Sequence, residues 1–145
     1  MKKTLFLDFD GVLHGEGKNS NGKFEHMEKF CHTVRPFVNN LQIVISSSWR
    51  ETHSLESLKS FFEKDIGDII VGVTPLFIDR FDSGGREKEI LEYCRINSID
   101  TNNWVALDDM EILFSNNCKN VILVDNEYGL LDGDIKMLKY FLTKN

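Results

Sequence analysis

Two aspartates at the end of a short apolar segment are the residues of this chain whose types and spacing best suit chemistry. Asp8 and Asp10 follow the apolar residues 4–7, and a glycine comes directly after them. Buried strands of a parallel sheet read as apolar runs, and ligands of such sheets collect at the carboxyl ends of the strands. Two carboxylates this close repel each other unless a divalent cation lies beside them. The pattern predicts a metal-dependent site, with an acidic turn as the alternative, since Asp and Gly are common in turns.

Other predicted strands also end in polar residues. Ser46 follows the apolar segment 41–45, and Asp108 and Asp109 follow the segment 104–107. Because the carboxyl ends of parallel strands meet at one edge of a sheet, these side chains are expected to lie near the first two aspartates. Several carboxylates suit Mg²⁺, a hard cation that prefers oxygen ligands. A hydroxyl group and a positive charge beside them suit a phosphate, so the set predicts phosphoryl transfer.

A basic residue for this site is expected at the start of the predicted helix 86–96. Arg86 and Lys88 both lie there, but at 3.6 residues per turn they point about 200° apart, so only one of them can face the site. Arg86, at the helix start, is the first choice. Ser47 and Arg50 follow the second predicted strand and, together with Lys88, are the candidates for binding the phosphate of a substrate.

Three other polar or aromatic residues near these strand ends are interpreted as structural. His14 lies in the polar, glycine-rich segment 14–23, which is predicted to be a solvated loop. Trp49 is expected to be a core residue or a plug at the edge of the sheet. Asp125 ends the last predicted strand and is expected to cap a helix or a loop.

The elements that must position these groups alternate along the chain. Strands are predicted at residues 4–7, 41–45, 69–73, 104–107 and 121–124, and helices near 24–34, 55–62, 86–96, 110–116 and 134–143, with Ser54 and Asp132 as caps. Such alternation is typical of a parallel sheet with helices on both faces. The sequence therefore predicts an α/β fold: a three-layer, Rossmann-like, doubly wound parallel sheet of about five strands, in a single domain over residues 1–145.

Length and composition bound the function. The 145 residues include 41% hydrophobic and 28% charged residues, as in ordinary globular domains, and the net charge of −6 disfavours non-specific binding to nucleic acid or to an anionic membrane. The three cysteines lack paired spacing, which indicates reduced thiols rather than a disulfide framework or a zinc site. No apolar run is long enough for a signal peptide or a membrane span, so a cytoplasmic location is expected.

The order of the motifs resembles that of the haloacid dehalogenase (HAD) superfamily. Residues 8–12, Asp-Phe-Asp-Gly-Val, are similar to its first motif, D-x-D-G-[VT], and Ser46, Arg86 and Asp108–Asp109 stand in the order of its second, third and fourth motifs. Within this superfamily, the chain resembles the HAD domain of Swiss-army-knife RNA repair proteins. The short segments that carry this resemblance are Ser-Ser-Ser-Trp-Arg, Arg-x-x-Glu-Ile, Leu-Asp-Asp and Gly129-Leu130.

The resemblance implies a role for each acidic residue. Asp8 is implied to be a nucleophile that forms an aspartyl-phosphate, and Asp10 an acid that protonates the leaving group and then activates water. Mg²⁺ is implied to bind the side chain of Asp8, the main-chain carbonyl of Asp10, and Asp108. Asp109 either binds the metal directly or supports it.

The resemblance also implies the contacts to the phosphoryl group. Ser46 would hydrogen-bond its oxygens, and Arg86 would offset the charge that develops on them. Because the superfamily mostly uses lysine in the third motif, Lys88 stays an alternative to Arg86.

The spacing of the motifs leaves no room for a cap domain, so an open, HAD-like site is expected. The expected function is that of a Mg-dependent phosphomonoester phosphatase, acting on polynucleotide ends or on another bulky substrate such as a phosphoprotein, with no membrane partner. The enzyme alternatives are a nucleotidase, a small-metabolite phosphatase or a phosphotransferase. The non-enzyme alternative is a phospho-aspartate receiver or a binding module. The receiver is disfavoured because the third predicted strand ends in Gly-Val-Thr-Pro, without an aspartate.

Overall fold

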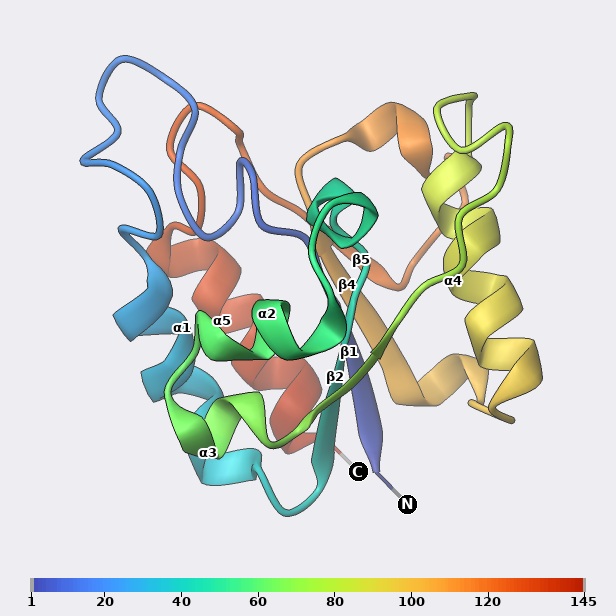
Figure 1. Cartoon of the computed structure of the whole chain (residues 1–145), viewed down its shortest axis with the longest axis horizontal. Coiled ribbons are helices and arrows are strands. Elements are labelled where there is room, and N and C mark those ends of the chain that lie inside the picture. The colour runs from blue at the N-terminus through green and yellow to red at the C-terminus, as the bar shows by residue number, and fades with distance from the viewer. Residues whose placement is uncertain (1, 145) are drawn as a thin grey trace.

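Five parallel strands form the sheet that carries the candidate site (Figure 1). The computed structural model describes residues 2–144. The strands are β1 (Lys3–Leu7), β2 (Leu41–Ile45), β3 (Ile70–Val73), β4 (Trp104–Asp108) and β5 (Val121–Leu123). They lie in the order β3-β2-β1-β4-β5, so the chain winds outward from β1 first in one direction and then in the other. This order confirms the predicted doubly wound parallel sheet.

Helices cover both faces of the sheet and complete the three predicted layers. The α-helices are α1 (Met27–Val34), α2 (Leu55–Ser60), α3 (Lys64–Gly67), α4 (Gly85–Ile96) and α5 (Asp132–Thr143), and the 3₁₀ segments are η1 (Arg35–Phe37), η2 (Ser48–Glu51), η3 (Thr101–Asn103) and η4 (Glu111–Leu113). Figure 1 shows α1, α2, α3 and α5 on one side of the sheet and α4 on the other.

The two faces of the sheet bury separate hydrophobic clusters, because successive residues of a strand point to opposite faces. In β1, Leu5 and Leu7 pack with α1, α2, α3 and α5. Phe6, between them, packs toward α4 and meets Tyr93 and Trp104 edge-on, with 5.7 and 5.6 Å between ring centroids. These three β1 side chains are fully buried, so packing on both faces holds the strand that leads to the candidate site.

Element boundaries differ from the prediction where local contacts decide them. The first helix begins at Met27 rather than near residue 24, because Phe24 takes a left-handed backbone conformation with φ 60°. The predicted cap at Asp132 is wrong. Leu131 occupies the N-cap position of α5, and the carboxylate of Asp134 accepts its backbone N–H at 2.9 Å.

Other local predictions match the structure. Ser54 caps α2 by accepting the Ser57 N–H at 3.1 Å. Asp125 caps a loop by accepting the Glu127 N–H at 3.0 Å. The helix predicted at 110–116 is shorter than expected and forms only η4. Within residues 2–144, none of the helices combines the length and the apolar character that crossing a membrane requires.

Candidate active site

The register of the central strands brings three polar residues to one edge of the sheet. The last residue of β1 pairs with the last residue of β2 and with Leu107 of β4. The ladder continues one residue further, since the Asp8 N–H donates to the Leu107 carbonyl at 3.1 Å and the Ser46 N–H to the last carbonyl of β1 at 3.0 Å. Asp8, Ser46 and Asp108 therefore stand at the same level on three adjacent strands, with Asp8 in the middle and about 4.8 Å between neighbouring strands.

A cluster of three carboxylates forms at this edge. Oxygen atoms of Asp8, Asp108 and Asp109 lie within 4.8 Å of one another, which is close enough to share one metal ion. Asp8 is 4% exposed and Asp108 is fully buried, whereas Asp109 is partly exposed. Gly11 makes room for Asp109: it has a φ of 76°, and a Cβ at that position would collide with the Asp109 carboxylate.

Arg86 is the cation that faces these carboxylates. Its Nη1 lies 2.8 Å from Asp108 Oδ2 and 3.3 Å from Asp8 Oδ2. Burial opposes a charged guanidinium, but the carboxylates of Asp108 and Asp8 outweigh it, and they raise the pKa of Arg86 above its ordinary value. Lys88 is exposed and directs its Nζ toward Asp79 Oδ2, 3.5 Å away. The geometry therefore places Arg86, and not Lys88, at the site.

The cluster carries more negative charge than Arg86 can balance. Burial, followed by the neighbouring charge of Asp108, raises the pKa of Asp8 well above its ordinary value, although Arg86 acts in the opposite direction. Burial also raises the pKa of Asp109. If all three carboxylates are ionised, one guanidinium leaves an excess of two negative charges, which one divalent cation would balance. The donor set therefore fits a hard divalent metal ion.

Ser46 offers a hydroxyl group that the rest of the described chain does not use. Its Oγ is fully buried, and among residues 2–144 it has no hydrogen-bond partner. A buried polar group without a partner costs about 1–3 kcal/mol, so this hydroxyl is a natural contact for an oxygen of a bound ligand. The Oγ1 of Thr74, directly after β3, is also buried and has no hydrogen-bond partner among residues 2–144. Nothing in the sequence pointed to this residue.

Ser47 and Arg50, the other predicted contacts to substrate, both make contacts within the protein. The Ser47 Oγ accepts the backbone N–H of Trp49 at 3.2 Å and caps η2. All five N–H donors of Arg50 are used within the protein, and its Nη2 lies 2.7 Å from Glu89 Oε1 in a pair that is almost fully buried. The other acceptors are the main-chain carbonyls of Thr74, Ser46, Ser47 and Pro75. The structure thus corrects the prediction for Arg50, which ties the ends of β2 and β3 to α4.

The side chain of Asp10 lies outside the carboxylate cluster. Its Oδ1 lies 3.0 Å from His14 Nε2, and its Oδ2 accepts the Trp49 Nε1–H at 3.0 Å. His14 is buried, and its Nδ1 accepts the backbone N–H of Phe24 at 3.1 Å. The prediction of a solvated His14 is therefore wrong. The sequence places His14 four residues after Asp10, but this spacing alone does not predict that the two side chains are in contact.

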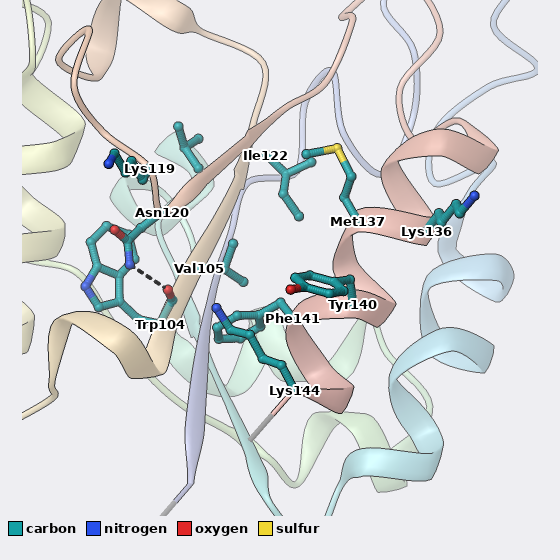
Figure 2. Close-up of a pocket in the computed structure, with 11 residues that line it drawn as sticks. Trp104, Val105, Lys119, Asn120, Ile122, Lys136, Met137, Tyr140, Phe141 and Lys144 are labelled. Carbon is teal, nitrogen blue, oxygen red and sulfur yellow. Dashed lines mark hydrogen bonds between the residues drawn. The ribbon is translucent and has the colours of Figure 1, made fainter.

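A separate apolar groove lies between β4, β5 and α5 (Figure 2). Its volume is about 440 Å³, and its wall includes Val105, Ile122, Met137, Tyr140 and Phe141. None of the site residues described above lines it, so the groove is distinct from the carboxylate cluster.

Fold and site together define a doubly wound α/β domain with an acidic cluster at the carboxyl ends of its strands. The family model for the HAD domain in Swiss Army Knife RNA repair proteins matches residues 4–135, and the chain belongs to this family. No curated protein matches the chain. A crystal structure of the N-terminal part of the protein BF1531 from Bacteroides fragilis, containing a phosphatase domain complexed with Mg, is similar in fold. It superposes with a TM-score of 0.57 at 19% identity, over 99% of this chain and 40% of that chain.

Proposed function

We propose that this chain is a Mg²⁺-dependent phosphomonoesterase with Asp8 as its nucleophile. The observation that carries the proposal is one edge of the sheet that holds three carboxylates, one buried guanidinium and one unpartnered buried hydroxyl, all within the described residues 2–144. Carboxylates that hold a cation, and donors that hold phosphoryl oxygens, are the groups that phosphoryl transfer needs. The Bacteroides fragilis protein of similar fold contains a phosphatase domain complexed with Mg, which supports the proposal.

The metal ion fits the carboxylate cluster. Asp8, Asp108 and Asp109 would hold Mg²⁺ with their side chains, and the main-chain carbonyl of Asp10 would add a further oxygen ligand. Bound there, Mg²⁺ would neutralise charge on the phosphoryl oxygens. With all three carboxylates ionised, the cluster has an excess of two negative charges beyond Arg86, which supports a divalent ion.

Asp8 and Asp10 would share the chemical steps. In the first step an oxygen of Asp8 attacks phosphorus, the bond between phosphorus and the substrate oxygen breaks, and that oxygen leaves with a proton from Asp10. In the second step water attacks phosphorus and gives a proton to Asp10, and the bond between phosphorus and Asp8 breaks. Inorganic phosphate leaves, and both aspartates are back in their initial states.

Ser46 and Arg86 would hold the group that is transferred. The Ser46 hydroxyl has no other partner among residues 2–144, so it can donate to a phosphoryl oxygen without giving up an internal hydrogen bond. Arg86 lies beside Asp8 and would stabilise negative charge that develops during attack. Both groups are buried, where such interactions are stronger than in water.

The proposed substrate is a phosphorylated polynucleotide end. The family description, a domain of RNA repair proteins, supports this class. Between β1 and β2 the chain forms only α1 and η1, and residues 74–84 form turns and loops, so neither segment builds a cap over the site. An open site can admit a phosphate carried on a large molecule. The net charge of −6 suggests that contact is limited to the end of the polynucleotide.

Phosphate release from an aryl phosphate tests the reaction class. Wild type should release phosphate with Mg²⁺ and not with EDTA, and Asp8→Asn should be inactive under both conditions. Asp8→Asn should remove only the nucleophile and leave the fold and the other site groups in place. The matched control is Asp82→Asn, which should keep full activity because Asp82 is exposed. Turnover that survives in Asp8→Asn would contradict the mechanism.

A substrate panel then tests the substrate class. We expect oligonucleotides with a 3′- or 5′-phosphate to be hydrolysed with a higher kcat/KM than the matching nucleoside monophosphate, a sugar phosphate or a phosphopeptide. The reverse order would favour a nucleotidase or a small-metabolite phosphatase, and transfer to an added alcohol would indicate a phosphotransferase. Labelling of an aspartate other than Asp8 by acetyl phosphate, in a protein without turnover, would favour a receiver.

A further inference from the structure

We infer that His14 and Trp49 are positioning residues that orient the carboxylate of Asp10 for proton transfer. This inference rests on the proposed function, in which Asp10 exchanges a proton with the leaving group and then with water. It concerns two residues that sequence analysis interpreted as structural.

Each oxygen of Asp10 has its own partner from a different part of the chain. His14 Nε2 lies 3.0 Å from Oδ1, and Trp49 Nε1–H donates to Oδ2 at 3.0 Å. His14 comes from the loop after β1, and Trp49 comes from η2, directly after β2. Two contacts on two oxygens fix both the position and the plane of a carboxylate, whereas one contact would leave it free to rotate.

The hydrogen-bond network assigns the proton on His14. The backbone N–H of Phe24 donates to His14 Nδ1 at 3.1 Å, so Nδ1 is an acceptor without a proton. In a neutral imidazole the other nitrogen then carries the hydrogen. His14 Nε2–H therefore donates to Asp10 Oδ1. The indole N–H of Trp49 can only donate, so both neighbours hold Asp10 as donors and leave the remaining lone pairs of its oxygens for proton exchange.

The partners of Asp10 are themselves held in place. The Trp49 ring stacks on His53 at 5.2 Å between centroids and meets the rings of Phe9 and Phe61 at 5.3 and 5.5 Å. Only 11% of the His14 side chain is exposed, against 42% for Asp10. Solvent therefore reaches the carboxylate of Asp10, while His14 is buried and Trp49 is only partly exposed.

The backbone at Phe24 is a further sign that this arrangement is maintained at a cost. Phe24 has a φ of 60°, and a left-handed conformation costs a residue other than glycine about 1–2 kcal/mol. Its N–H is the group that donates to His14 Nδ1. Strain of this kind persists where surrounding contacts stabilise it, and here the strained residue fixes the tautomer of His14.

The leaving group decides how much this orientation matters. A dinitrophenolate leaves without a proton because it is a weak base, whereas an alkoxide from a sugar or an alkyl phosphate must be protonated as the bond breaks. Because kcat/KM covers the steps up to the first bond cleavage, it reports on proton donation by Asp10 and not on the later attack of water. A positioning role therefore predicts an effect on kcat/KM that depends on the substrate.

The experiment compares variants on 2,4-dinitrophenyl phosphate and on an alkyl phosphate, with Mg²⁺. Trp49→Phe keeps a ring in the aromatic cluster and removes the N–H donor, and His14→Leu removes the other donor. For each we expect kcat/KM to fall at least about 10-fold on the alkyl phosphate and less than about 3-fold on the dinitrophenyl ester, as a fraction of the roughly 10²–10⁴-fold that general acid catalysis provides. His14→Gln, whose amide can donate to Oδ1, should regain most of the lost activity.

His32→Leu is the matched control, because His32 is an exposed histidine of α1 and has no contact with Asp10, His14 or Trp49 among the interactions described. It should change kcat/KM on both substrates by the same factor. Equal losses on both substrates in Trp49→Phe and in folded His14→Leu, or no rescue by His14→Gln, would overturn the positioning role while leaving the phosphatase intact. A wild type that hydrolyses neither ester would overturn the proposed function and this inference with it.

Discussion

Replacing the proposed nucleophile should make the metal-free protein more stable, even though it abolishes the activity. Asp8→Asn removes one buried charge from a cluster of three carboxylates that Arg86 alone cannot balance. Arg86 keeps its shorter contact, at 2.8 Å, with Asp108. Burial and the neighbouring Asp108 raise the pKa of Asp8, so the ionised carboxylate is held in the folded chain at a cost. Because one pKa unit corresponds to about 1.4 kcal/mol, a neutral amide of similar shape should stabilise the metal-free protein by on the order of 1–3 kcal/mol. At about 3 °C per kcal/mol for a domain of this size, Tm in EDTA should rise by roughly 3–9 °C.

Magnesium should remove this advantage. At a concentration 100 times its Kd, a bound ligand stabilises a protein by about 2.7 kcal/mol, and wild type retains the complete set of carboxylates. Asp8→Asn has lost one ligand, so Mg²⁺ should raise its Tm by less. The difference in Tm between the two proteins should therefore be smaller in saturating Mg²⁺ than in EDTA, or should change sign.

The pH dependence of this difference has a definite sign. The pKa of Asp8 is raised on folding, chiefly by burial, so the folded chain binds this proton more tightly than the unfolded chain does. Stability in EDTA is therefore lost as pH rises from about 4, the range of an unfolded aspartate, upward through the folded pKa. The advantage of Asp8→Asn should be small at the acid end and should widen with pH.

Thermal unfolding of wild type, Asp8→Asn and the exposed control Asp82→Asn, in EDTA and in Mg²⁺ over this pH range, measures all three effects. A lower stability of Asp8→Asn than of wild type, in EDTA at neutral pH, would refute the prediction. An equal rise in the Tm of both proteins with Mg²⁺ would refute it as well.

Three other substitutions separate site groups from structural ones. Ser46→Ala should leave Tm unchanged or slightly higher, since the Ser46 hydroxyl has no partner among residues 2–144. It should lower kcat by about 10²-fold. A large fall in Tm with little loss of kcat would contradict the role of Ser46 as a contact to the phosphoryl group. Arg50→Met should lower the free energy of unfolding by about 3–5 kcal/mol, because it leaves Glu89 buried and unpaired; an unchanged denaturation midpoint would show that this ion pair does not stabilise the fold. Lys88→Ala should change kcat/KM by less than about 2-fold and the free energy of unfolding by less than about 0.5 kcal/mol, as at other exposed positions. A larger change in kcat/KM would show that Lys88 contributes to the site.

The sequence predicted the sheet and the site edge because both depend on local patterns. Buried parallel strands are short apolar runs, and in this chain the runs at β1, β2 and β4 end directly in Asp8, Ser46 and Asp108. The rule that strand ends converge then placed these residues together without knowledge of the register. Helix periodicity likewise separated Arg86 from Lys88, since two residues two positions apart face different sides.

The predictions that were wrong depend on contacts between distant segments. The partner of Arg50, Glu89, lies 39 residues further along the chain, so nothing near Arg50 in the sequence shows that its donors are used internally. His14 lies in a segment whose composition is that of a solvated loop, and its burial follows from Phe24 and from the packing of that loop on η2. Composition predicts that a loop is present, but it does not predict which of its side chains turn inward.

The most direct test of the proposed mechanism is the identity of the phosphorylated residue. Wild type would be mixed with a phosphorylated oligonucleotide and Mg²⁺, quenched in acid during turnover, reduced with borohydride to convert any acyl phosphate, and mapped by peptide mass spectrometry. We expect modification at Asp8 alone, and none in EDTA or in Asp8→Asn. Modification of another residue, or continued phosphate release with Asp8 unmodified throughout, would contradict the mechanism.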